Sequence, residues 1–297
     1  MKGLPRQATS RSRILYVQYG NPAAYPPLEH SAGQLADAGC DVVLLGAHTA
    51  GVEALSLPPH KRIRVTLQPA SRRGWRQKLH YLRFCLWVIW QAARSRPRWV
   101  YASDVLSTPV ALFLKTVFRR RVIYHEHDAY DPEGATAFMR LCLAARGRLA
   151  RIADLNVLPS DGRIDHFCRD NVVLKERCVR VWNCPDLAEV RPPRGETARE
   201  GLGLLYQGSI VPARLPVAVL QAMAQLPVTV TLRVIGYETI DHLGYVDRLK
   251  AEAARLTLGA RVEFLGAIPN RNRMLELSDT CAVGLAFMPL KTEDVNM

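Results

Sequence analysis

The sequence predicts an α/β protein with two doubly wound parallel domains, and three observations support this. The chain has 297 residues, about twice the length of a typical domain. Short apolar strands alternate with helical stretches from residue 14 to 183 and again from 204 to 287, as in successive β-α-β units. The strands show little polar alternation, which is typical of sheets that helices cover on both faces.

A polar stretch rich in Pro and Gly, residues 185–203, separates the two series. We therefore expect an amino-terminal domain over 1–187, a linker over 188–201 and a carboxyl-terminal domain over 202–297. Doubly wound units bind ligands at the carboxyl ends of their strands, so we expect a ligand in a cleft between the two domains. The expected strands are 14–19, 41–46, 62–68, 99–103, 121–126, 155–160, 178–183, 204–208, 229–236, 261–266 and 281–287; the expected helices are 28–39, 75–94, 109–118, 135–152, 161–169, 216–226, 241–257 and 269–278.

Composition favours a globular protein of a reducing compartment. Hydrophobic residues make up 48% and charged residues 23%, a balance typical of folded soluble domains. The seven cysteines are scattered without a C-x-x-C pair, which argues against a disulfide framework and against a structural zinc site. The basic start leads into only a short apolar run, so we expect no signal peptide and a cytoplasmic location.

The positive charge is concentrated in the first part of the chain. Of the formal net charge of +13, residues 1–190 carry 28 Lys and Arg against 16 Asp and Glu, whereas the remainder is nearly balanced. Between Glu53 and Asp104 there are eleven Lys or Arg and no acidic residue. Such asymmetry indicates a face that meets an anionic partner. No nucleic-acid-binding motif is present, so nucleic acid is not the expected partner.

Residues 72–98 combine basic and aromatic side chains in one predicted helix. The apolar run from Phe84 to Trp90 is short, whereas a membrane span needs about 20 apolar residues. One interpretation is an interfacial helix that lies on an anionic membrane surface. The other is a core helix of the first domain whose ends are basic and solvated.

The segment 204–227 offers a site for phosphate groups. An apolar strand is expected to end at Gly208, Arg214 lies in the following loop, and a helix is expected to start near Pro216. Free N–H groups at a helix start and a guanidinium suit a diphosphate. The segment contains neither G-x-G-x-x-G nor a P-loop, and a strand, loop and helix of this kind are also ordinary architecture.

This segment, together with VTLRVIG, RVEFLGAIPN (261–270) and LELSDTCAVGLAFMP (275–289), resembles the carboxyl domain of family 4 retaining glycosyltransferases of the GT-B type. The resemblance implies two Rossmann-like domains, with Arg214 contacting the donor diphosphate and Gly208 and Ser209 lining the same loop. Ser209 stands where many members carry a second basic residue. The backbone of Gly236 is expected to border the nucleotide.

The first domain supports the resemblance through residues 101–134, in which an Asp-bearing strand end precedes VIYHEHD. Aligned with the family pattern, His127 takes the place of the active-site histidine and Asp128 that of its acidic follower; His125 stands where members often have Asp. A histidine at a strand end can bind a sugar hydroxyl or shuttle a proton near neutral pH. Residues 125–128 could also be read as metal ligands, but no second cluster completes a site, and no metal is expected.

The resemblance implies transfer of a glycosyl unit from a nucleoside-diphosphate sugar to an acceptor hydroxyl, with retention of configuration and without a cofactor. We expect a lipid-linked or polysaccharide acceptor and peripheral attachment to the inner face of the membrane; no oligomeric state is predicted. The alternatives are a non-catalytic partner subunit that docks a glycosyltransferase to the membrane, and a nucleotide-sugar epimerase of the same fold.

The family also carries two Glu residues eight positions apart, shortly after an N-M or N-[YF]-R sequence. The chain reaches that point at Asp294–Met297. We therefore expect an incomplete second domain and a chain that is inactive or weakly active by itself. Two further polar residues, Ser160 and Asn183, are expected to have structural roles.

Overall fold

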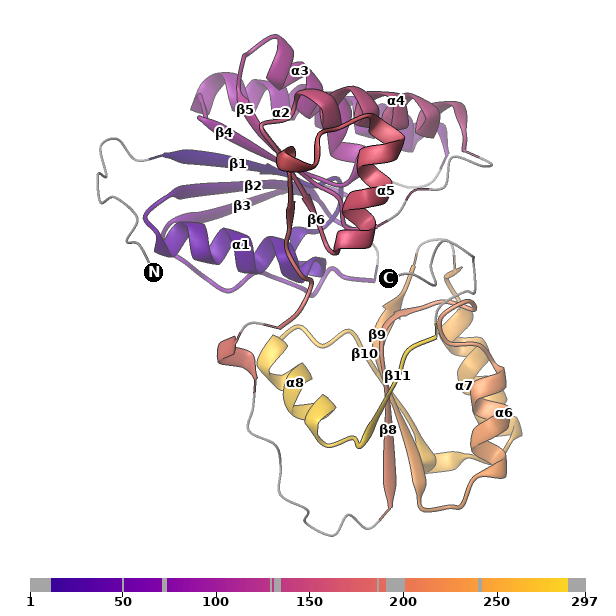
Figure 1. Ribbon diagram of the computed structural model, residues 1–297. Helices are drawn as coiled ribbons and strands as arrows, with labels where there is room; N and C mark the ends of the chain where they lie inside the picture. Colours follow the sequence, from indigo (N-terminus) through magenta and orange to yellow (C-terminus); the bar gives the residue numbers. More distant parts are fainter. Residues whose placement is uncertain are drawn as a thin grey trace. The chain divides into compact units, whose positions relative to one another are not determined.

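The computed structural model describes residues 12–49, 51–70, 74–128, 130, 135–185, 187–190, 201–239 and 242–287. The chain divides into two compact units. The first contains the chain up to His48 and Leu57–Cys184, and the second contains Thr49–Ser56 and the chain from Pro185 onward. Both units are built on a parallel sheet flanked by helices, which confirms the predicted fold class (Figure 1).

The first unit contains a seven-stranded parallel sheet in the order β3-β2-β1-β4-β5-β6-β7. The order reverses direction at β1, so β1 and β4 are neighbours although two other strands separate them in sequence. The strands are β1 (Arg13–Val17), β2 (Asp41–Ala47), β3 (Ile63–Gln68), β4 (Trp99–Ser103), β5 (Arg121–His125), β6 (Leu155–Leu158) and β7 (Cys178–Arg180).

Helices cover both faces of this sheet, which explains the continuous apolar strands. On one face Tyr16 of β1 packs in a core with Leu28 of a helix. On the other, Leu15 packs in a core with Phe84 and Leu114 of two further helices. The helices are α1 (Pro26–Asp37), α2 (Trp75–Ser95), α3 (Thr108–Thr116), α4 (Ala137–Ile152) and α5 (Asp161–Asn171).

Helix α2 is a core helix along one of its faces. Tyr81, Phe84, Val88 and Ala92 are buried, so for this face the core-helix interpretation of residues 72–98 is confirmed; residues 72 and 73 lie outside the described part of the chain. Within that part, no helix combines the length and the apolar character needed to cross a bilayer.

The second unit contains a four-stranded parallel sheet in the order β10-β9-β8-β11. Its core joins Tyr206 and Leu232 of the sheet to Leu220 and Leu249 of two helices on one face; a third helix lies on the other face (Figure 1). The elements are β8 (Leu202–Ile210), α6 (Ala218–Gln225), β9 (Val230–Glu238), α7 (Tyr245–Arg255), β10 (Val262–Gly266), α8 (Arg271–Asp279) and β11 (Val283–Leu285).

Helix α8 is tied to the first residues of the second unit. Arg271 forms an ion pair with Glu189, and its second nitrogen Nη2 donates to Oε2 of the same carboxylate at 3.1 Å. The side chain of Asn270 accepts the N–H of Arg273 at 2.9 Å and caps the helix. Of the expected linker 188–201, residues 191–200 lie outside the described residues, as does the end of the chain from 288 to 297.

Paired glycines allow β8 to continue beyond the end that the sequence predicted. Gly208 lies opposite Gly236 of β9 in the parallel register, with φ of +145° and +150° respectively. A Cβ on Gly236 would lie 1.8 Å from the carbonyl oxygen of Gly208. The expected strand end at Gly208 was therefore wrong, because β8 runs on to Ile210; α6 correspondingly begins at Ala218 rather than near Pro216.

We expect Gly236→Ala to destabilise the second unit by at least about 2–3 kcal/mol, because the methyl group meets backbone and the φ value disfavours a side chain. Gly284→Ala in β11 is the matched control, since among the described residues only its chain neighbours come within 4 Å of an added Cβ. Urea unfolding followed by circular dichroism measures both. Equal stability of the two variants would contradict the paired-glycine geometry.

Candidate functional site

The carboxyl ends of β4 and β5 bring four polar side chains together. The two strands pair with Ser103 opposite His125, so Asp104 and His127 follow at the same sheet edge. Nε2 of His127 lies 2.9 Å from the hydroxyl of Ser103. The backbone N–H of His127 donates to Oδ1 of Asp104 at 3.1 Å. The sheet register therefore holds the His127 ring through Ser103 and the His127 backbone through Asp104.

His125 and His127 lie on the same side of the chain, as alternation along the strand predicts. Their ring centroids are 3.9 Å apart. His125 is buried, and its Nδ1 lies 2.5 Å from the hydroxyl of Tyr101. Tyr25 approaches His127 from another element, with ring centroids 5.7 Å apart. Asp128 is exposed directly after this pair.

Burial decides the charge of the two histidines. Desolvation lowers the pKa of His127 to about 4, although the nearby carboxylate of Asp128 acts in the opposite direction. Desolvation and the neighbouring His127 hold the pKa of His125 well below its usual value. Both rings are therefore neutral at neutral pH. Each ring can exchange hydrogen bonds with a hydroxyl, but its lowered pKa does not suit proton transfer near pH 7. The sequence had suggested such proton transfer for His127.

Asp104 is a site residue that sequence reasoning missed. Its carboxyl group is 7% exposed, and burial raises its pKa to about 7, with Asp128 and Glu126 adding in the same direction. Its φ of 63° and ψ of 173° fall in a region that is close to glycine-only. Strain and a costly buried carboxyl group at a strand end are typical of functional positions. The sequence signal that could have identified this residue is an Asp directly after an apolar strand.

Glu126 lies between the two histidines and has a different role. Its carboxylate is almost fully buried and accepts hydrogen bonds from the hydroxyl of Tyr124 at 2.8 Å, from Arg146 at 2.5 and 2.8 Å, and from Arg163 at 3.1 Å. Arg146 and Arg163 come from α4 and α5. This network anchors the segment that carries His125 and His127, so Glu126 is a positioning residue.

No metal centre is evident at this sheet edge. Within the described ranges, no group of three or more His, Cys, Asp or Glu residues is arranged to hold a metal ion. Ser160 has the expected structural role, because its hydroxyl accepts the N–H of Arg163 at 3.3 Å and caps α5. Asn183 lies exposed after β7.

In the second unit, the predicted phosphate-binding residues surround the end of β8. Gly208 and Ser209 belong to the strand itself, and Arg214 follows in a tight turn in which its N–H donates to the carbonyl of Val211 at 3.0 Å. The Arg214 guanidinium is exposed and has no hydrogen bond or ion pair with the described residues. It lowers the pKa of Tyr206, which burial raises. A free guanidinium beside a strand end can bind an anion.

The first turns of α6 and α7 differ in how their N–H groups are satisfied. At α7, the carboxylate of Glu238 accepts the N–H groups of Gly244 at 3.1 Å and Val246 at 2.5 Å. At α6, which follows the Arg214 turn, no side chain caps the helix, and the N–H groups of Val219 and Leu220 donate to the backbone carbonyls of Pro216 and Val217 at 3.0 and 2.9 Å. The first N–H groups of a helix and its dipole attract anions when no carboxylate occupies them. The positive dipole end of α6, beside Arg214, therefore suits an anion better than the start of α7, which the Glu238 carboxylate occupies.

No protein-family model matches the chain, and no curated protein sequence matches it. Solved structures do share its fold. Anabaena Alr3699/HepE in complex with UDP and glucose is 21% identical with a TM-score of 0.68, over 92% of this chain and 73% of that chain. Sucrose-phosphate synthase from Thermosynechococcus elongatus is 17% identical with a TM-score of 0.72, over 95% and 78% of the two chains.

The apo form of the lipopolysaccharide outer core galactosyltransferase WaaB is 14% identical with a TM-score of 0.52, over 94% of this chain and 76% of that chain. These similarities show that the chain has a GT-B glycosyltransferase-like fold, as the sequence resemblance implied.

We expect Asp104→Asn to change how stability depends on pH. The folded pKa of Asp104, about 7, lies above its ordinary value of 3.8, so the wild-type chain loses stability as the pH rises from about 4 to about 7. Asparagine keeps an acceptor for the His127 N–H but cannot ionise. The variant should gain stability relative to wild type across that window, by on the order of a few kcal/mol.

Urea unfolding at several pH values between 4 and 8 measures this difference. Asp170→Asn is the control, because Asp170 is exposed on α5 and has no partner among the described residues. A pH-independent difference between wild type and Asp104→Asn would show that Asp104 ionises normally in the folded chain.

Proposed function

We propose that this protein is a glycosyltransferase that moves a sugar from a nucleoside-diphosphate donor to an acceptor hydroxyl, with retention of configuration. The observation that carries the proposal is the end of β8, where Gly208, Ser209 and the unpaired Arg214 lie before the uncapped start of α6. The GT-B glycosyltransferase-like fold supports it. So does the presence of UDP and of UDP-glucose in the structures of Anabaena HepE, which has this fold.

In the proposed donor site, the diphosphate lies against the start of α6 and the guanidinium of Arg214. Gly208, two residues before the end of β8, has no side chain, so the backbone can approach the phosphates there. The backbone of Gly236 on the neighbouring strand is the proposed border of the nucleotide.

During transfer, the bond between the sugar C1 and the diphosphate oxygen breaks, and its electron pair remains on the diphosphate. The acceptor oxygen forms a new bond to C1 and loses its proton. The departing phosphate oxygen, which gains charge as the bond breaks, accepts that proton. Arg214 and the positive dipole end of α6 stabilise the growing negative charge, which takes the place of a metal ion.

His127 and Asp128 have the acceptor-side roles in this proposal. The neutral His127 ring, which Ser103 holds while Asp104 accepts the backbone N–H of His127, offers a hydrogen bond to a sugar hydroxyl. Because burial holds its pKa near 4, orienting the sugar suits it better than taking up the acceptor proton. The exposed Asp128 can accept a second hydroxyl hydrogen bond. We propose a lipid-linked or polysaccharide acceptor, in keeping with the basic character of the first part of the chain.

We expect Arg214→Ala to weaken UDP binding by at least about tenfold, which corresponds to about 1.4 kcal/mol for a lost charge-assisted hydrogen bond. Arg214→Lys should retain part of the affinity, because lysine keeps the charge but loses the guanidinium fork. Arg248→Ala, an exposed arginine of α7, is the control. Isothermal titration calorimetry measures all four proteins. Unchanged affinity in Arg214→Ala would remove the diphosphate assignment.

We expect His127→Asn to leave UDP affinity unchanged and to lower turnover of the sugar nucleotide by about 10–100-fold, because the lost hydrogen bond orients the sugar and not the diphosphate. Release of nucleoside diphosphate from UDP-, GDP- and ADP-sugars measures turnover, with His166→Asn as the control in the same unit. A product with an epimerised sugar still attached to the nucleotide would identify an epimerase instead.

A further inference from the structure

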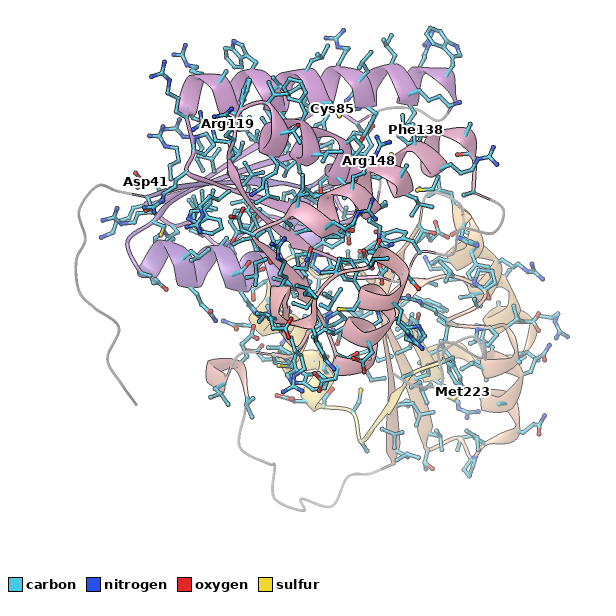
Figure 2. All side chains as sticks on the ribbon, turned by 45° about the horizontal axis from the view of Figure 1, so that its top comes forward. Asp41, Cys85, Arg119, Phe138, Arg148 and Met223 are labelled. Atoms are coloured by element: carbon cyan, nitrogen blue, oxygen red, sulfur yellow. The ribbon has the colours of Figure 1, made fainter. Side chains whose placement is uncertain are left out.

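The outward face of α2 carries a continuous apolar stripe. The exposed fractions are 70% for Trp75, 49% for Leu79, 54% for Leu82, 58% for Leu86 and 55% for Trp90. Steps of three and four residues place these five side chains in one row along the helix. The row lies opposite the buried face of Tyr81, Phe84 and Val88, so it takes no part in the core. Side chains of this helix project away from the sheet (Figure 2).

Only positive charges accompany this stripe. Arg76, Lys78, Arg83 and Arg94 are exposed on its two flanks, and the sequence contains no acidic residue between Glu53 and Asp104. Arg76 and Arg94 also lie over the rings of Trp75 and Trp90, at 5.7 and 5.9 Å from the ring centroids. A helix face of apolar and cationic residues is typical of a surface that binds anionic lipid.

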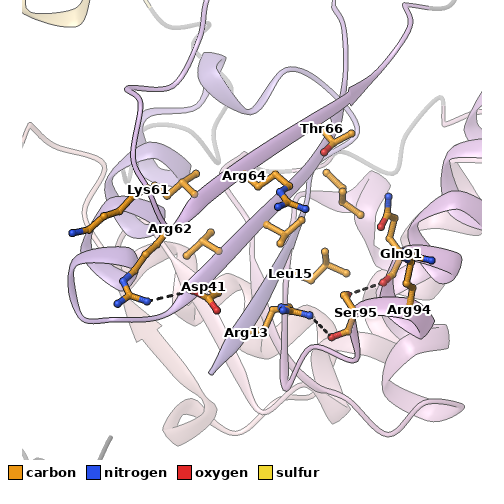
Figure 3. Close-up of a pocket in the computed structure, with 14 residues that line it drawn as sticks. Arg13, Leu15, Asp41, Lys61, Arg62, Arg64, Thr66, Gln91, Arg94 and Ser95 are labelled. Carbon is orange, nitrogen blue, oxygen red and sulfur yellow. Dashed lines mark hydrogen bonds and ion pairs between the residues drawn. The ribbon is translucent and has the colours of Figure 1, made fainter. Parts of the chain in front are cut away.

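A cationic groove with a volume of about 500 Å³ lies beside the last turn of α2. It is at the amino-terminal ends of β1, β2 and β3, and therefore at the sheet edge opposite the one that carries His127. Its floor is apolar. The charged residues that line it are Arg13, Asp41, Lys61, Arg62, Arg64 and Arg94 (Figure 3).

The groove contains more cationic side chains than acidic groups that could neutralise them. Arg62 pairs with Asp41, the one acidic residue among those that line the groove, at 3.4 Å. Arg13 donates to the carbonyl of Ser95 at 2.8 Å. Lys61 and Arg64 have no hydrogen bond or ion pair with the described residues. Arg94 lines the groove and flanks the stripe, so the two features form one surface.

We propose that this surface, the outward face of α2 with the adjoining groove, docks on an anionic lipid bilayer. The tryptophans and leucines of the stripe enter the interface between headgroups and acyl chains, and the groove holds lipid phosphates. The stripe runs for about 22 Å along the helix from Trp75 to Trp90, with a tryptophan at each end, the side chain that prefers this interface.

The arrangement favours a bilayer over a protein partner. A lipid surface is flat, negatively charged and apolar just below its headgroups, so a straight apolar row between cations matches it along its whole length. The flank contains no acidic group to pair with basic residues of another protein. The proposal concerns the first unit alone and holds whether or not the donor site in the second unit binds a sugar nucleotide.

Vesicle flotation tests the proposal with the full chain. We expect binding to phosphatidylcholine vesicles that contain phosphatidylglycerol, at least about tenfold weaker binding to phosphatidylcholine alone, and weakening by salt, because the charges are exposed. Leu82→Ser with Leu86→Ser, and separately Arg64→Gln with Arg94→Gln, should each reduce binding about tenfold or more. Thermal unfolding checks that the variants remain folded.

The controls remove matched groups from the second unit. Val228→Ser replaces an apolar side chain that is 80% exposed, and Arg248→Gln with Lys250→Gln removes two exposed charges from α7; both should bind vesicles like wild type. Failure of the wild-type chain to float, or equal losses in the control variants, would overturn the proposal. The proposal would also be overturned if wild type did not bind vesicles and the Leu82→Ser with Leu86→Ser variant had a different molar mass in solution from wild type. The stripe would then be a contact between copies of the chain.

Discussion

The first unit depends on the buried carboxylate of Glu126. Strand β5 ends one residue earlier, and the chain must leave the sheet there while holding two histidine rings in place. Arg146 and Arg163 meet the carboxylate from two different helices, so the network fastens α4 and α5 to the end of the strand. Desolvating these charges offsets much of their attraction, but removing one partner of such a network costs about 3–5 kcal/mol. The interaction fixes geometry more than it adds stability.

The fold was largely predictable because its signals are local. Apolar runs without polar alternation indicated parallel strands covered on both faces, and the two sheets confirm this. Alternation along β5 also placed His125 and His127 on one side. The register between neighbouring strands was harder to predict from the sequence. Gly208 looked like a strand end, and only its pairing with Gly236 shows why the strand continues.

The candidate site was predictable in its positions but not in its electrostatics. A sequence presents Glu126 as a charged residue between two histidines, and its burial depends on arginines 20 and 37 residues further along the chain. The lowered pKa of His127 likewise results from packing that no motif describes. The sequence shows Asp104 directly after an apolar strand, but the strained backbone and the raised pKa of this residue arise only in the folded chain.

The two faces of α2 show the same limit. Its sequence suggested either a core helix or an interfacial one, whereas the structure shows one buried face and an opposite face that is exposed and apolar. A 21-residue helix with apolar side chains on two opposite sides offers two candidate core faces, so the sequence pattern alone does not tell which of them is buried. Only the identity of the residues it packs against distinguishes them.

Asp104 has a consequence for how this protein can be altered. Its backbone conformation suits glycine, and its carboxyl group is costly to bury as an anion, so both properties oppose folding at the same residue. Selection for heat resistance alone would replace it early, whereas selection for chemistry at the β4–β5 edge would keep it. A stability-optimised library that is also screened for turnover would reveal at this residue how much folding free energy the site gives up.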